Sequence, residues 1–245
     1  MNYRPSPFAG LPPVTKNLLI INAIFLLATW VAENTFGINL NTYLGLHLPS
    51  SELFNPAQLG TYMFMHGGFM HLFFNMFAVF MFGRVLEVYW GPKKFFTFYI
   101  ITGIGAAAIN IGANYIDYFS TLSQLSDQQY QIVMEKGAEA MRNYQNFTDP
   151  LMGKFNKILN GPTVGASGAV FGILLAFGML FPNTELMLLF PPIPLKAKYF
   201  VIIYGVVELF MGVANFSFDN VAHFAHLGGM AFGFILIKYW QKKGV

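Results

Sequence analysis

The run GASGAVFGILLAFGMLF occupies residues 165–181, and its one serine, Ser167, opens an otherwise apolar segment. A second apolar segment, residues 222–240, carries His226 within the run AHLGGMAFG. Polar groups are costly inside a membrane and usually have a function there. A serine and a histidine in separate apolar segments, each beside small residues, suggest a nucleophile and a base that meet inside a bilayer.

Composition places the chain among membrane proteins. Of its 245 residues, 55% are hydrophobic and 10% are charged, and the mean hydropathy is +0.51. A water-soluble domain of this length needs a more highly charged surface. The sequence has no cysteine, which excludes disulfides, thiolate metal ligands and a cysteine nucleophile.

Apolar segments of the right length recur along the chain. A membrane-spanning helix needs about 20 mostly apolar residues. The segments that fit are roughly residues 18–36, 61–82, 95–116, 165–181, 199–217 and 222–240. The polar, proline-rich start lacks the apolar stretch of a secretory leader, so we expect the first segment to stay as a helix. The sequence therefore predicts an all-α membrane protein, a bundle of six transmembrane helices.

The remaining segments are more polar. The expected divisions are an N-terminal segment 1–17, a membrane domain 18–240 and a tail 241–245. Residues 37–60 are too irregular to span, so we expect an interfacial first loop. Residues 117–162 are predicted to form a polar insert between the third and fourth helices, with a helix near 128–146. We favour a passive external loop for this insert; the alternative is a cover over a cavity, which would select what reaches Ser167.

Basic residues predict the orientation. With six spans, both termini lie on one side of the membrane. That side would hold Arg4, Lys16, Arg84, Lys93, Lys94, Lys196, Lys198, Lys238, Lys242 and Lys243, against Lys136, Arg142, Lys154 and Lys157 on the other. The distribution predicts cytoplasmic termini and an external insert.

Small residues surround both candidate catalytic residues. Ser167 could simply bond back to a carbonyl one turn earlier. However, Gly165 permits unusual backbone beside it, and Gly168 allows close helix contact. His226 could be an interfacial histidine bonded to a carbonyl, but Gly229 and Gly233 recur on the adjacent helix face. Such a face would bring a base within reach of a nucleophile.

A third polar cluster is the run HGGFMHLFFN at residues 66–75. His71 and Asn75 are four residues apart and share a helix face. A lone histidine here would make a helix–helix hydrogen bond. Together with an asparagine, it is more typical of donors aimed at developing negative charge.

Two other kinds of site compete with this interpretation. His66, His71, His223 and His226 could be pictured as metal ligands, but their spacing is not the H-E-x-x-H pattern, so we expect no metal and no cofactor. Glu208, in the middle of the fifth segment, would by default indicate transport. A single acid with no obvious basic partner is weaker support than the serine and histidines.

The three motifs, in this order and on separate segments, resemble the signatures of rhomboid intramembrane serine proteases. They are His71 with Asn75, Gly165-x-Ser167-Gly168, and Ala225-His226-x-x-Gly229-x-x-x-Gly233. The resemblance covers about residues 17–239. It implies that Ser167 is the nucleophile and His226 the general base, in a dyad that needs no third acid. It implies an oxyanion hole of His71, Asn75 and the backbone N–H of Ser167, and a structural role for Glu87.

The resemblance also implies a function. The chain would be a serine endopeptidase that cleaves transmembrane segments of other membrane proteins near their external ends, through an acyl-enzyme. Its partners would be transmembrane-helix substrates and the lipid bilayer, not nucleic acid, and its location a bacterial inner membrane. The oligomeric state stays open. The alternatives are an inactive relative that binds transmembrane helices, and a transporter, which would need several intramembrane charges or paired broken helices.

Overall fold

The computed structural model describes residues 10–187, 192–214 and 221–244. The start of the expected N-terminal segment and the end of the expected fifth span, residues 215–217, lie outside these residues. The regular structure of the described chain is helical apart from one isolated bridge and two short antiparallel strands, β1 (Glu185–Met187) and β2 (Pro194–Lys196). The predicted all-α class is confirmed.

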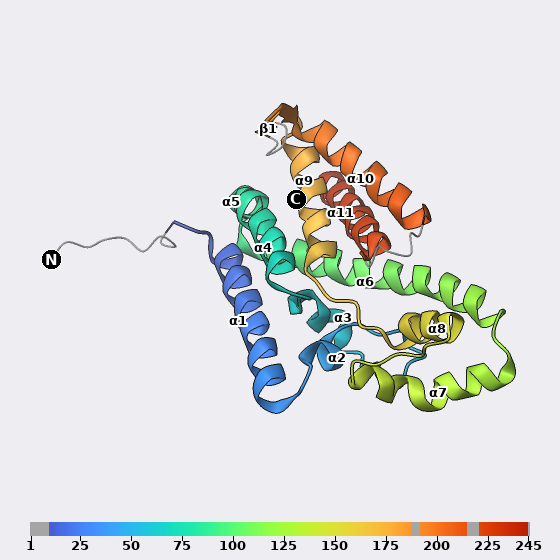
Figure 1. Ribbon diagram of the computed structural model, residues 1–245. Coiled ribbons are helices and arrows are strands. Elements are labelled where there is room, and N and C mark those ends of the chain that lie inside the picture. The colour runs from blue at the N-terminus through green and yellow to red at the C-terminus, as the bar shows by residue number, and fades with distance from the viewer. Residues whose placement is uncertain (1–9, 188–191, 215–220, 245) are drawn as a thin grey trace.

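The long helices follow the expected apolar segments. They are α1 (Pro13–Phe36), α4 (Phe69–Ala78) continued through a π-helical turn into α5 (Arg84–Trp90), α6 (Pro92–Leu122), α9 (Ser167–Leu180), α10 (Ala197–Ala214) and α11 (His223–Lys243). The other helices are α2 (Leu40–Leu44), α3 (Gln58–Thr61), α7 (Asp127–Arg142) and α8 (Pro150–Asn160). Figure 1 shows α9, α10 and α11 side by side, with α2, α3, α7 and α8 gathered beyond α6.

The chain is a multi-pass membrane protein. Within the described residues, four helical stretches are long and apolar enough to cross a membrane: α1, residues 69–90, α6 and α10. The helix α9 is apolar but has only 14 residues. The helix α11 is long enough but carries histidines, glycines and lysines. The predicted count of six spans therefore stays a prediction.

The second expected span begins later than predicted. Residues 61–64 form the end of α3 and a 3₁₀ turn, and the long helix starts at Phe69, directly after Gly67-Gly68. It then continues to Trp90 and ends at Gly91, whose φ of +80° favours glycine. The glycine pair shifts the span because it interrupts the helix that hydropathy alone would have drawn through it.

The helix α9 forms the centre of the bundle. Most of its residues between Gly168 and Gly178 are buried, and it packs against α6, α10 and α11. A helix that is apolar on every side is buried on every side. Ser167, its first residue, is therefore held by an element with little freedom to move.

The insert is a folded layer with a core of its own. Its polar helix is present as α7, and begins with a capping box between Ser126 and Gln129. The buried residues of this second core are Leu48, Tyr118, Val133, Met152, Phe155 and Leu159. The helix α6 extends to Leu122, beyond the predicted start of the insert at residue 117. Since Leu48 belongs to the first loop and Tyr118 to this extension of α6, the core joins α7 and α8 to both. The insert is therefore packed against the rest of the chain, and its passive or substrate-selecting role stays a prediction.

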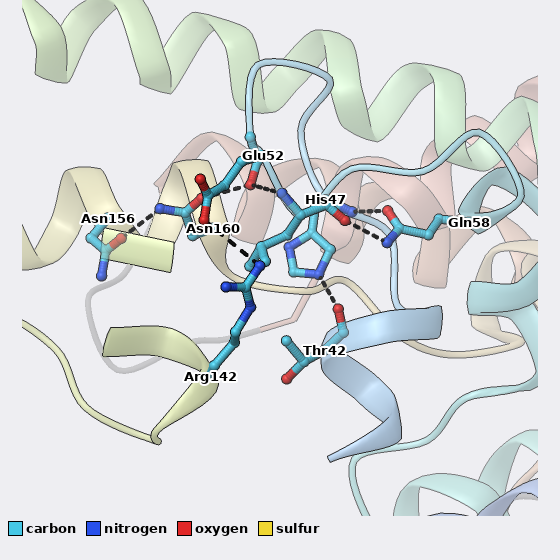
Figure 2. Close-up of polar contacts among 9 residues, drawn as sticks. Thr42, His47, Glu52, Gln58, Arg142, Asn156 and Asn160 are labelled. Carbon is cyan, nitrogen blue, oxygen red and sulfur yellow. Dashed lines mark hydrogen bonds and ion pairs between the residues drawn. The ribbon is translucent and has the colours of Figure 1, made fainter. Parts of the chain in front are cut away.

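Polar contacts also fix the insert to the first loop (Figure 2). Ser51 Oγ donates to Asn160 Oδ1 at 2.6 Å, and Asn160 Nδ2 donates to Asn156 Oδ1 at 2.8 Å. In the same loop, the buried His47 ring bonds to the Thr42 carbonyl at 2.9 Å, and its burial lowers its pKa. The neutral ring therefore suits an interior position at pH 7.

Glu87 joins the second helical stretch to the first helix. The first N–H groups of a helix lack intrahelical partners, and Pro13, which opens α1, has none to offer. Glu87 Oε1 accepts from the N–H of Val14 at 2.8 Å, and Oε2 accepts from the N–H of Thr15 at 2.7 Å. The Glu87 side chain is 2% exposed, which fits the structural role that the sequence predicts.

We expect Glu87→Ala to lower the free energy of unfolding by about 1–3 kcal/mol, because two buried N–H groups lose a charged acceptor. Thermal unfolding in detergent measures the change. The matched control is Glu139→Ala, which alters an exposed carboxylate on α7. Equal unfolding midpoints for the two variants would contradict the assigned role.

Candidate active site

The backbone before Ser167 depends on a glycine. Gly165 has φ of +133°, a region that L side chains rarely adopt. A Cβ at this position would also lie 2.8 Å from Nε2 of His71 and 3.5 Å from Oγ of Ser167. The Gly165 N–H donates to the Tyr62 carbonyl at 3.0 Å. Glycine is therefore required both by the turn and by the side chains that meet over it.

Ser167 and His226 meet between two helices. Ser167 Oγ at the start of α9 lies 2.8 Å from Nε2 of His226 in the first turns of α11. His226 is 7% exposed. The distance is within the range in which a base can take the proton of a nucleophile.

Glycines bring α9 and α11 to backbone distance. A Cβ on Gly229 would lie 1.8 Å from the carbonyl oxygen of Gly168, so no larger residue fits there. A Cβ on Gly172 would lie 3.1 Å from the carbonyl oxygen of Gly229, and one on Gly233 3.4 Å from Cα of Gly172. This close contact, of the kind that small residues permit, sets the separation of Ser167 and His226.

Phe171 holds the plane of the histidine ring. Its ring lies parallel to that of His226, with centroids 4.1 Å apart and an interplanar angle of 7°. Phe171 is one turn after Ser167, so both side chains leave α9 on the same face. Phe171 was not predicted as a site residue, although its spacing of four from Ser167 was a usable signal.

Glu208 of α10 is the main addition to the predicted site. Its Oε2 lies 2.8 Å from Nδ1 of His226 and 2.6 Å from Nδ1 of His223. The carboxylate is buried, at 8% exposed for the residue. The expectation that Glu208 has no basic partner is therefore wrong. In the sequence, only the mid-span position of Glu208 indicated a functional role. That position does not predict which helix the side chain faces.

His71 offers a donor on the serine side of the site. Its Nδ1 accepts from the N–H of Gly67 at 3.3 Å. A neutral imidazole has one donor and one acceptor nitrogen, so this contact assigns the proton of His71 to Nε2. That nitrogen is the one that crowds Gly165 beside Ser167.

Asn75 lies one turn further along α4. Its Nδ2 donates to the carbonyl of His71 at 2.8 Å. Since an amide group carries two N–H donors, this bond leaves a second donor on the same buried side chain. His71 and Asn75 thus lie one helical turn apart, as predicted, and the Asn75 side chain is hydrogen-bonded to the His71 backbone.

The histidines pictured as possible metal ligands divide into two groups. His66 packs its ring against His71, with centroids 5.0 Å apart. His223 and His226 instead join Glu208, and the candidate ligand atoms of these three lie within 4.8 Å of one another. Among the described residues, Glu208, His223 and His226 are thus the one group that could hold a cation. Glu208 was not among the ligands pictured from the sequence.

Comparisons with known proteins point to one family. A family model described as the Rhomboid domain matches residues 54–242. Rhomboid protein 1, mitochondrial, of Saccharomyces cerevisiae is 26% identical over 182 residues, which are 74% of this chain and 41% of that protein. An uncharacterized mitochondrial rhomboid protein of Schizosaccharomyces pombe is 25% identical over 206 residues, 75% of this chain and 51% of that protein. The chain thus spans about half or less of the length of these relatives.

We expect Gly229→Ala to lower the unfolding midpoint and to slow the reaction of Ser167 with a fluorophosphonate by at least about tenfold, because an added methyl group forces α9 and α11 apart. The control is Gly112→Ala on α6, where a Cβ would meet nothing within 4 Å. Wild-type reactivity in Gly229→Ala would show that the contact does not set the geometry of Ser167.

Proposed function

The chain belongs to the rhomboid family, and we propose that it is an intramembrane serine endopeptidase that cleaves transmembrane segments of other membrane proteins. The observation that carries the proposal is the 2.8 Å contact between Ser167 Oγ and His226 Nε2. This pair is buried among the helices of a multi-pass membrane protein, where an unused polar pair would be a net cost.

In the proposed reaction, Ser167 Oγ attacks the scissile carbonyl carbon while His226 Nε2 takes the hydroxyl proton. The tetrahedral intermediate then collapses, and His226 gives the proton to the departing amine. The remaining acyl-enzyme is hydrolysed by water, which His226 deprotonates in the same way. The proton thus returns to Ser167 and no cofactor is consumed.

The developing oxyanion would be held by three kinds of donor. They are the Nε2–H of His71, the amide of Asn75 and the backbone N–H of Ser167. The last is supported by position, because Ser167 is the first residue of α9 and the first N–H groups of a helix have no intrahelical partner. The positive end of the helix dipole adds to the same effect. Loss of one such donor typically costs about 10²–10³ in rate.

The length of α9 supports cleavage below the membrane surface. Its 14 residues rise by roughly 21 Å, whereas the hydrocarbon core is about 30 Å thick. If Leu180, the last residue of α9, lies at the cytoplasmic interface, then Ser167, its first residue, lies inside the bilayer. A substrate helix must unwind to expose a carbonyl there, so we expect small or helix-breaking residues around its cleaved bond.

We expect Ser167→Ala to abolish cleavage of a generic transmembrane substrate by the purified protein while leaving the unfolding midpoint unchanged. A fluorophosphonate should label the wild type at Ser167 and leave the variant unlabelled. Ser123→Ala, which alters an exposed hydroxyl after α6, is the control and should cleave normally. Cleavage by Ser167→Ala would refute the mechanism, and an inactive, unlabelled wild type would favour a binding-only relative.

The orientation proposed for the chain rests on its basic residues. Ten of them would lie with the termini, and the four others belong to the insert, so we place the termini in the cytoplasm and the insert outside. The bacterial inner membrane stays a prediction, since the two relatives above carry mitochondrial names.

Single cysteines test this orientation, because the chain has none of its own. We expect Gln131→Cys in α7 to react with an impermeant maleimide in spheroplasts and Lys243→Cys near the C-terminus to react only after lysis. Both side chains are exposed, so burial does not explain a difference between them. The reverse pattern would invert the orientation.

A further inference from the structure

The buried carboxylate of Glu208 lies on the far side of His226 from Ser167. The two ring nitrogens of His226 make different contacts: Nε2 is 2.8 Å from Ser167 Oγ, and Nδ1 is 2.8 Å from Glu208 Oε2. The three residues come from three helices, α9, α11 and α10. Serine, imidazole and carboxylate therefore form one continuous hydrogen-bonded line.

This arrangement decides which nitrogen of His226 carries the proton. An ionised carboxylate only accepts hydrogen bonds, so Nδ1 of His226 must donate to it. A neutral ring with its proton on Nδ1 has a free lone pair on Nε2. That lone pair is what a general base needs in order to take the proton of Ser167. In the opposite tautomer Nε2–H faces the hydroxyl and cannot accept its proton.

His223 binds the same carboxylate oxygen. Its Nδ1 lies 2.6 Å from Glu208 Oε2, and it precedes His226 by three residues, so both rings lie on one side of α11. A buried carboxylate is costly unless donors surround it. The second histidine supplies one of them, which helps to keep Glu208 ionised and fixed in place.

We propose that Glu208 is a positioning residue that completes the Ser167–His226 pair, holding His226 in the Nδ1–H tautomer and stabilising the imidazolium that forms when it takes the serine proton. The inference rests on the proposed function, and goes beyond it by adding a third residue to a site expected to work as a dyad. In this proposal His223 acts through its contact with Glu208.

The contact distances favour hydrogen bonds over a bound metal ion. A tetrahedral zinc ion with bonds of about 2.0–2.1 Å would hold its ligand atoms roughly 3.3 Å apart. The two Nδ1–Oε2 distances are 2.6 and 2.8 Å, which are ordinary for charge-assisted hydrogen bonds. An ion on Nδ1 of His226 would instead leave the proton on Nε2 and block the base.

Glu208→Gln tests the role by kinetics. Gln keeps the shape of the side chain but removes its charge and lets an N–H group face Nδ1. We expect kcat for a transmembrane substrate to fall by about 10²–10⁴-fold, with KM within about threefold of wild type, because Glu208 does not touch the substrate. The control, Glu185→Gln in the exposed hairpin strand β1, should change neither. A kcat within about threefold of wild type for Glu208→Gln would overturn the proposal.

His223→Phe separates support from positioning. Because it keeps a ring at this position but removes the second donor on Glu208 and leaves His226 in place, we expect kcat to fall by less than about tenfold. A loss as large as that of Glu208→Gln would show that His223 does more than support Glu208 and would contradict its assigned role.

A measurement on the wild type keeps the proposal testable where Glu208→Gln does not fold. With ¹⁵N-labelled histidine rings, and His226 assigned by comparison with His226→Gln, nuclear magnetic resonance should show His226 protonated at Nδ1 and unprotonated at Nε2. The opposite tautomer would overturn the proposal. So would one equivalent of zinc in the purified protein that Glu208→Gln loses.

These outcomes also distinguish the inference from the proposed function. A wild type that cleaves and labels, with kcat unchanged in Glu208→Gln, refutes the role of Glu208 alone. A wild type that neither cleaves nor labels refutes the proposed function, and the ring tautomer still decides whether Glu208 holds His226 as inferred.

Discussion

The contact between α9 and α11 at backbone distance is the constraint on which the site depends. Gly229 lies against the Gly168 carbonyl with no room for a Cβ. A side chain of ordinary size would separate the helices by more than the tolerance of a hydrogen bond, and the Ser167–His226 contact at 2.8 Å would be lost. In a lipid solvent, where apolar side chains gain little by leaving the lipid, such close packing is a principal source of helix association.

Four polar side chains at the site satisfy one another inside the bundle. Ser167, His226, Glu208 and His223 form a chain of hydrogen bonds across three helices. Each would be costly alone in an apolar interior, and a fully bonded network both lowers that cost and fixes the orientation of its members. The hydrogen bond between His226 Nδ1 and Glu208 thus serves both stability and chemistry. It lowers the cost of burying the carboxylate, and it also sets the tautomer of His226.

Contacts at both ends stabilise the bundle. Glu87 accepts from the first N–H groups of α1, which ties the second helical stretch to the first. At the other end the insert packs a second core against the first loop and the extension of α6. The loop that leads into Ser167 is held against the first loop, because Thr163 pairs with Leu46 through two backbone hydrogen bonds of 2.8 Å.

The sequence by itself determined the class, the apolar segments and the polar helix of the insert. It also singled out Ser167, His226, His71 and Asn75 as the candidate site. Hydropathy and helical spacing are local properties, so they can be read along the chain. Only the tertiary structure decided that Glu208 faces His226 and that Phe171 stacks on its ring. It also decided that the insert has a core. These contacts join residues far apart along the chain, or depend on how one helix is rotated against another. Packing fixes that rotation, and a single sequence does not encode it in any local pattern.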